Sequence, residues 1–221
     1  MSSVAFTNIA TLVTNDGTLE KGQLGIHNGA TLVVEDGFIA SISRSTPSGV
    51  DQEIDCSDRT LLPGFVDSHS HLIFAGDRAD EFAARSHGQK YTAGGIASTV
   101  KATRLTTDAA LHANAQRLLD EALSTGTTTM EIKSGYGLTE KDELRSIQIA
   151  SNFTDETTLL AAHVIPEEFA TNADAYVKLI IESIIPASQA KWIDVFCDRG
   201  AFTAEQSEAI LRAGMAHGMI P

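Results

Sequence analysis

The chain has 221 residues, with 16 Lys and Arg against 29 Asp and Glu, which gives a formal net charge of −13. This acidity argues against a nucleic-acid partner, which needs a basic face, and no stretch approaches the roughly 18 apolar residues that span a bilayer. The N-terminus lacks a signal-peptide pattern and the two cysteines, Cys56 and Cys197, lie far apart, so we expect a cytoplasmic protein with reduced thiols.

The first 62 residues predict a small β-domain. Residues 30–44 alternate apolar and polar side chains around Asp36-Gly37, and an Asp-Gly pair between alternating runs is a strong hairpin signal. Residues 4–14 and 53–64 are further strand candidates. The short strands and the glycines indicate part of a β-sandwich rather than a complete core. We therefore assign residues 1–62 to the N-terminal part of a small β-sandwich.

From residue 63 onward the pattern changes to strand, loop and helix. Apolar segments that end in polar residues predict four strands, at 64–74, 127–135, 157–165 and 190–200. Amphipathic segments predict four helices, at 106–126, 139–153, 172–189 and 203–218. Alternating strands and helices indicate a parallel sheet, so the expected fold class is α/β.

Several residues predict where these helices begin and end. Thr107, Thr139 and Thr203 are of the type that caps a helix N-terminus, and Gln206 completes a capping box with Thr203. Proline cannot donate the backbone hydrogen bond of a helix interior. We therefore expect the third helix to break before Pro186.

The number of strand–helix units bears on the architecture. A complete (β/α)8 TIM barrel needs roughly 250 residues, so four units leave a half-barrel, an open α/β domain or a truncated protein as alternatives. The last residues, AHGMIP, leave a capped helix, turn at Gly218 and begin what should be a fifth strand. We therefore expect residues 63–221 to be the N-terminal half of such a barrel, apparently truncated.

Each predicted strand ends in polar residues. A barrel of this kind carries its functional groups at these strand ends. His69 and His71 are two apart on the first strand, so both side chains leave the same face and two imidazole nitrogens can converge on one cation. Asp67 precedes them on that face and could orient them or compete as a ligand. The alternative is a pair of surface or hydrogen-bonded histidines, because a catalytic zinc site usually needs three protein ligands.

Longer motifs make a resemblance specific. The stretch PGFVDSHSHLIFAGDRADEF resembles the first barrel strand of the amidohydrolase superfamily, where an H-x-H pair binds metal. FAGDRADEF, GGIASTVKATR, TTTMEIKSGYGLT, LLAAHVIPEEF and DVFCDRGAF resemble, in this order, blocks of the imidazolonepropionase family. The resemblance implies an amidohydrolase-type (β/α)8 barrel combined with a composite β-sandwich.

The resemblance also implies a metal and a reaction. His69 and His71 would bind one divalent ion, zinc or iron. The reaction would be hydrolysis of the ring amide C–N bond of 4-imidazolone-5-propanoate to N-formimidoyl-L-glutamate by a metal-activated water. The family's other metal ligands and its general base would lie beyond Pro221, so we expect this chain alone to be inactive. Lys133 could be a carboxylated, metal-bridging lysine, as in some relatives, but we favour a structural ion pair or hydrogen-bond donor.

Substrate contacts follow from the same resemblance. Arg78 would bind the propionate carboxylate, which suits its planar guanidinium, and Tyr136 would contact the substrate from the loop of the second strand. His163 would act as a catalytic residue that hydrogen-bonds the ring carbonyl oxygen and stabilises charge developing there. Tyr91 is a further substrate-binding candidate.

Each assignment has a simpler alternative. Arg78 could form an ion pair with Asp80 or Glu81 beside a helix, Tyr136 could pack on the barrel rim, and His163 could be a buried histidine with its hydrogen bonds satisfied. For the whole chain, the alternatives are another cyclic amidohydrolase or deaminase of the superfamily, or a non-catalytic α/β module. The expected partner is the small-molecule substrate, without nucleic acid or membrane, and the family suggests a homodimer.

Overall fold

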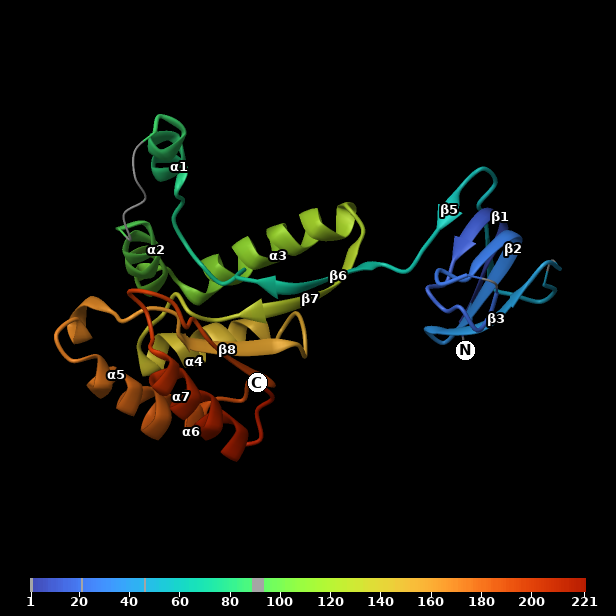
Figure 1. Cartoon of the computed structure of the whole chain (residues 1–221). Coiled ribbons are helices and arrows are strands. Elements are labelled where there is room, and N and C mark those ends of the chain that lie inside the picture. Colours follow the sequence, from blue (N-terminus) through green and yellow to red (C-terminus); the bar gives the residue numbers. More distant parts are fainter. Residues whose placement is uncertain (1, 21, 46, 89–93) are drawn as a thin grey trace. The chain divides into compact units, whose positions relative to one another are not determined.

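The computed structural model describes residues 2–20, 22–45, 47–88 and 94–221. Tyr91 lies outside these described residues, and so do the side chains of Asp80 and Glu81. The chain divides into two compact units, Met1–Gly64 and Phe65–Pro221 (Figure 1). Within the described residues, no helix is both long and apolar enough to cross a membrane.

The first unit is a single β-sheet. Its strands are β1 (Ser3–Val13), β2 (Ile26–Glu35), β3 (Phe38–Ser43), β4 (Gln52–Asp55) and β5 (Thr60–Leu61). They pair in the order β3-β2-β1-β4, and β5 also pairs with β1. The predicted hairpin is confirmed, because β2 and β3 are antiparallel and turn at Asp36 and Gly37, with φ of 49° and 85°. Two consecutive positive φ values give the turn whose twist matches the strands.

The second unit contains a four-stranded parallel sheet. Its strands pair in sequence order, β6 (Phe65–Ser70), β7 (Thr127–Lys133), β8 (Thr157–Ala162) and β9 (Trp192–Val195). An isolated parallel bridge joins Trp192 to Ile220, so the residues after the last helix return to the β9 edge. The α/β fold class and its parallel sheet are therefore as the sequence predicts.

Helices connect and cover these strands (Figure 1). They are α1 (Ala79–Ser86), α2 (Gly94–Leu105), α3 (Asp108–Ser124), α4 (Glu140–Ala150), η1 (Glu167–Phe169), α5 (Ala173–Leu179), η2 (Ile180–Ile184), α6 (Ile185–Ala187) and α7 (Ala204–Ala216). The three predicted threonine caps are confirmed, each accepting a backbone N–H of the first turn, and Thr203 and Gln206 form the predicted capping box.

The break expected before Pro186 is wrong. Helix α5 runs into η2, which is π-helical, and α6 continues through Pro186 to Ala187. A π-helical segment replaces the usual i→i−4 pattern by a wider turn, so the lost proline N–H falls where the helix already changes its hydrogen bonding.

The two faces of the sheet differ in chemistry. On β7, Met130 and Ile132 belong to an apolar cluster with Leu111 of α3 and Ile149 of α4. Alternate residues of a strand point to opposite faces. Thr129, Glu131 and Lys133 therefore lie on the other face, where they line a pocket of about 500 Å³. The helices thus bury the apolar face, and the other face carries the polar residues that line this pocket.

Candidate active site

Four of the predicted site residues lie together where β6, β7 and β8 end. The rings of His71 and His163 stack with centroids 5.0 Å apart, and the Tyr136 ring lies 5.3 Å from His71 and 5.4 Å from His163. His69 completes the cluster, with its ring 5.5 Å from that of His71. Residues that are far apart in sequence are thus gathered at the carboxyl edge of the sheet, as expected for a parallel α/β fold.

Arg78 lies close to this cluster. It lines a pocket of about 440 Å³ together with His71, Tyr136 and Phe74. Arg78 is an exposed residue. An aromatic and imidazole wall beside one guanidinium suits a small planar molecule that carries an anionic group.

The loop 134–138, SGYGL, positions the Tyr136 ring. Gly135 has φ +114°, and a Cβ there would come within 2.9 Å of His163 Nδ1 and 3.0 Å of the Leu160 carbonyl oxygen. A Cβ on Gly137 would come within 2.5 Å of the Asp142 carbonyl carbon. Only glycine fits such close approaches, so both glycines flanking Tyr136 are dictated by the packing of this loop against β8 and α4.

Backbone carbonyls of the same loop orient two of the imidazoles. His71 Nδ1 lies 3.1 Å from the Ser134 carbonyl oxygen, and His163 Nδ1 lies 3.0 Å from that of Gly135. A carbonyl oxygen only accepts, so each Nδ1 carries the proton and donates it. In the neutral rings each Nε2 therefore keeps its lone pair.

Burial keeps both rings neutral near pH 7. It lowers the pKa of His71 to about 4, with the charges of His163 and His69 adding to the effect. Burial also lowers the pKa of His163. A neutral imidazole whose Nδ1–H is held by a backbone carbonyl is the form in which histidine binds a metal through Nε2.

The donors present fit part of a metal site. His69 and His71 leave the same strand, and the tautomer of His71 is suitable. Across residues 2–20, 22–45, 47–88 and 94–221, however, no three His, Cys, Asp or Glu side chains are grouped so as to hold a metal. The described residues therefore offer a pair of imidazoles rather than a complete ligand set.

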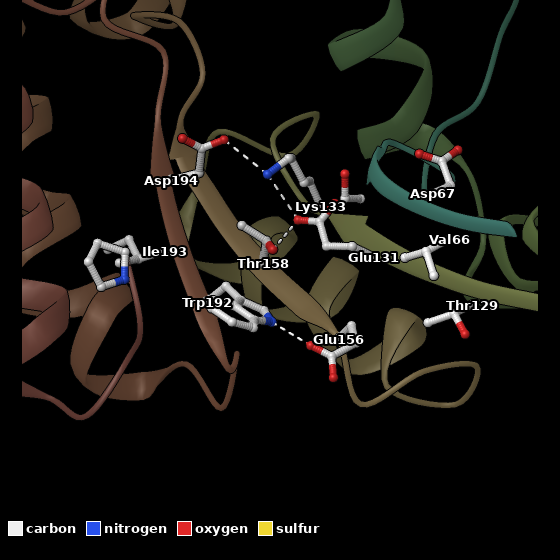
Figure 2. Close-up of a pocket in the computed structure, with 12 residues that line it drawn as sticks. Val66, Asp67, Thr129, Glu131, Lys133, Glu156, Thr158, Trp192, Ile193 and Asp194 are labelled. Atoms are coloured by element: carbon white, nitrogen blue, oxygen red, sulfur yellow. Dashed lines mark hydrogen bonds and ion pairs between the residues drawn. The ribbon is translucent and has the colours of Figure 1, made fainter. Parts of the chain in front are cut away.

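Lys133 forms the structural ion pair that the sequence favours. Its Nζ lies 2.9 Å from Glu131 Oε1 and 3.0 Å from Asp194 Oδ2 (Figure 2). Burial alone would lower the pKa of Lys133, but the hydrogen bonds to Glu131 and Asp194 outweigh it and raise the pKa above its usual value. A stabilised ammonium opposes carboxylation, which requires the neutral amine.

The sequence interpretation missed the partners of Lys133. Glu131 precedes it by two residues on β7 and so shares its face, which is a readable signal. Asp194 lies on β9, and only the strand order brings it near. Asp198 and Arg199, the polar residues that end the fourth predicted strand, lie exposed beyond the end of β9, where Asp198 Oδ1 accepts the Arg199 N–H.

Comparison with known proteins gives close sequence relatives. No family model matches the chain. The chain is 53% identical over 224 residues to the imidazolonepropionase of Nocardia farcinica, and the match covers 100% of this chain and 57% of that protein. It is 54% identical over 223 residues to the imidazolonepropionase of Rhodococcus jostii, covering 99% and 54%. The chain thus spans just over half the length of these curated relatives.

Solved structures share the fold at low identity. A triazine hydrolase variant superposes with a TM-score of 0.61 at 16% identity, covering 98% of this chain and 51% of that one. A guanine deaminase from C. acetobutylicum gives 0.59 at 15% identity, covering 99% and 51%. The chain therefore shares the fold of these structures, a partial (β/α) barrel with a β-domain.

Proposed function

We propose, from the premise that the whole chain is related in sequence to the imidazolonepropionases, that the protein hydrolyses 4-imidazolone-5-propanoate to N-formimidoyl-L-glutamate. Water adds across the ring amide bond: the carbonyl carbon gains the hydroxyl group and the ring nitrogen gains a proton. One observation carries the proposal beyond sequence likeness, namely the cluster of His69, His71, Tyr136 and His163 beside the pocket of Arg78.

His69 and His71 are the residues that would hold a divalent ion. Zinc and iron both suit imidazole ligands. Such an ion, when bound, supplies Lewis-acid activation of water near neutral pH. The contribution of this chain is the orientation of the ligand: the Ser134 carbonyl accepts the Nδ1 proton of His71 and so fixes its ring. Loss of an orienting partner of this kind typically costs about 10–100-fold in metal affinity or activity.

His163 would contact the ring carbonyl oxygen of the substrate. His163 Nδ1 donates its proton to the Gly135 carbonyl oxygen. In the neutral ring Nε2 has no proton, so it can donate a hydrogen bond to the substrate only after the ring takes up a second proton. Negative charge developing on the substrate oxygen raises the proton affinity of this nitrogen, and the charge of Asp194 acts in the same direction on the pKa of His163, against the burial that lowers it. His163 is thus suited to stabilise charge that appears during the reaction rather than in the bound substrate.

Arg78 and Tyr136 would bind the remainder of the substrate. The Arg78 guanidinium would hold the propionate carboxylate, and the Tyr136 ring would pack beside the imidazolone ring. Tyr91 is kept as a further contact. The strong negative charge of the chain makes such a local cation necessary for an anionic substrate.

The compartment, the oligomeric state, the partners and the domain bounds in this proposal rest on the resemblance to the imidazolonepropionase family. The protein acts on a small molecule in the cytoplasm, as a homodimer, without a nucleic-acid or membrane partner. Residues 1–62 form part of a composite β-sandwich, and residues 63–221 supply half of the barrel.

The direct test is an assay of the complete gene product purified with zinc or iron. We expect the absorbance of imidazolonepropionate to fall with time and N-formimidoylglutamate to accumulate. A panel of hydantoins, cytosine and guanine run in parallel addresses the other cyclic amidohydrolases and the deaminases. Turnover of a panel member with none of imidazolonepropionate would refute the assignment, and no turnover of any substrate would favour a non-catalytic module.

Replacing Arg78 with glutamine tests substrate anchoring. A hydrogen bond to a charged group contributes about 1.5–3 kcal/mol, so kcat/KM should fall roughly 10–100-fold, mainly through KM. An exposed arginine on α7, Arg212, provides the matched control, because its ion pair is with Glu208 of its own helix. With an analogue that lacks the carboxylate, R78Q and wild type should react equally. A loss of the same size on that analogue would contradict the role.

A further inference from the structure

The loop 134–138 holds both oriented imidazoles of the candidate site. The Ser134 carbonyl accepts from His71 and the Gly135 carbonyl accepts from His163. Both carbonyls belong to consecutive residues, so a small rotation of this loop would remove the partner of each ring. The tautomers of two histidines from different strands thus depend on one short segment.

Glu143 of α4 binds the backbone of this loop. Its side chain is fully buried, and Oε1 accepts the Gly137 N–H at 2.9 Å and the Leu138 N–H at 2.7 Å. Burial raises the pKa of Glu143, and hydrogen bonds from the Ser134 side chain and from backbone N–H groups of the loop act against that rise. The Glu143 carboxyl group therefore accepts the two loop N–H groups that backbone carbonyl oxygens would accept in a regular strand or helix.

The loop geometry gives a reason for a polar group here. Leu138 has φ +54°, a left-handed conformation that is unfavourable for a non-glycine residue. Its N–H and that of Gly137 would be buried without a partner if Glu143 were absent, because Gly137 and Leu138 are themselves buried. Arg104 adds a second constraint, since its Nε donates to the Gly137 carbonyl at 2.6 Å.

Glu143 is a costly residue to bury. Its side chain is fully buried, and burial disfavours the charged form of a carboxyl group. Glu143 thus costs stability, and its Oε1 binds the loop next to the imidazoles. These two properties are typical of a residue that positions a functional site.

We propose that Glu143 is a positioning residue: by binding the N–H groups of Gly137 and Leu138 it holds the loop so that the carbonyls of Ser134 and Gly135 fix His71 and His163 as Nδ1–H tautomers. Each Nε2 then keeps its lone pair for the site. The kinetic readout rests on the proposed function, but the tautomer readout does not.

The test is ¹⁵N NMR of the imidazoles in the 221-residue chain, measured for E143Q, E143D and E143L at a pH above 7. A glutamine side chain has the same length as glutamate and keeps an oxygen that can accept the two loop N–H groups. E143Q should therefore retain Nδ1–H tautomers at both histidines. The shorter E143D and the apolar E143L should give mixed tautomers at both. The activity of the complete gene product should change in parallel with the tautomers. We expect kcat to be about 10–100-fold lower in E143D and E143L, with little change in KM. E143Q should have a kcat close to that of wild type.

Ile149→Ala supplies the structural control. Ile149 is a buried residue on the same helix, in an apolar cluster that contains no residue of the loop 134–138, so its truncation lowers stability at a distance from the loop. If I149A shifts the tautomers as much as E143D, or if folded E143D keeps both Nδ1–H tautomers, the positioning role is overturned. E143D is the conservative variant should E143L fail to fold. Tautomer shifts without any imidazolonepropionate turnover in wild type would uphold Glu143 and refute the proposed substrate.

Discussion

Replacing His71 with alanine is expected to abolish most of the activity of the complete gene product, lowering kcat/KM by on the order of 10³-fold or more. The proposed metal contributes several kcal/mol of charge stabilisation, and about 1.4 kcal/mol corresponds to tenfold in rate. His71 is also the centre of the ring cluster, in contact with His69, Tyr136 and His163. H69A should act in the same direction.

The accompanying measurement is the metal content of each purified variant. Wild type should carry one zinc or iron per chain of the complete gene product, and H69A and H71A should carry less. His217, exposed at the C-terminal end of α7 and bonded to Ala213 of its own helix, provides a histidine control. If H69A and H71A carry as much metal as H217A and wild type, the two histidines are not ligands, and this result would favour the non-catalytic reading.

Local patterns in the sequence predict much of the fold because the elements have distinct periods. The alternation around Asp36-Gly37 fixes the β2–β3 hairpin, and the threonine caps fix the starts of α3, α4 and α7. The residues of the site can be predicted where the ends of the strands that carry them can be predicted. His69 and His71 share a strand, and His163 closes a parallel neighbour, so the sheet must bring them to one edge.

What could not be predicted depends on contacts between distant segments. Glu143 looks like an ordinary acidic residue in the first turn of a helix, where it complements the dipole. Only the packing of α4 against the loop 134–138 shows that its side chain is buried and bound to that loop. Asp194 likewise becomes a partner of Lys133 through strand order. Pro186 failed as a helix breaker because the π-helical segment before it changes the hydrogen-bond pattern.

Replacing Lys133 with methionine is expected to destabilise the second unit by about 3 kcal/mol, the lower end of the range for breaking a buried ion pair. The Lys133 and Glu131 side chains are only 8% and 12% exposed, so Glu131 would be left as a buried, unpaired carboxylate. Ser70 N and Thr158 Oγ1 still donate to that carboxylate, which limits the loss. Asp194 is 40% exposed and can be rehydrated.

Urea unfolding followed by fluorescence measures this loss in the right unit, because the single tryptophan of the chain, Trp192, lies on β9. K178M is the control: Lys178 pairs with Glu182 at the surface, where such pairs contribute about 0–1 kcal/mol. The double variant E131Q/K133M should be more stable than K133M alone, since the charge of the buried Glu131 is removed and only the more exposed Asp194 is left without its partner. If K133M loses no more than K178M, or if the double variant is the less stable of the two, Lys133 acts through something other than its buried ion pair, and a role in the site would need to be reconsidered.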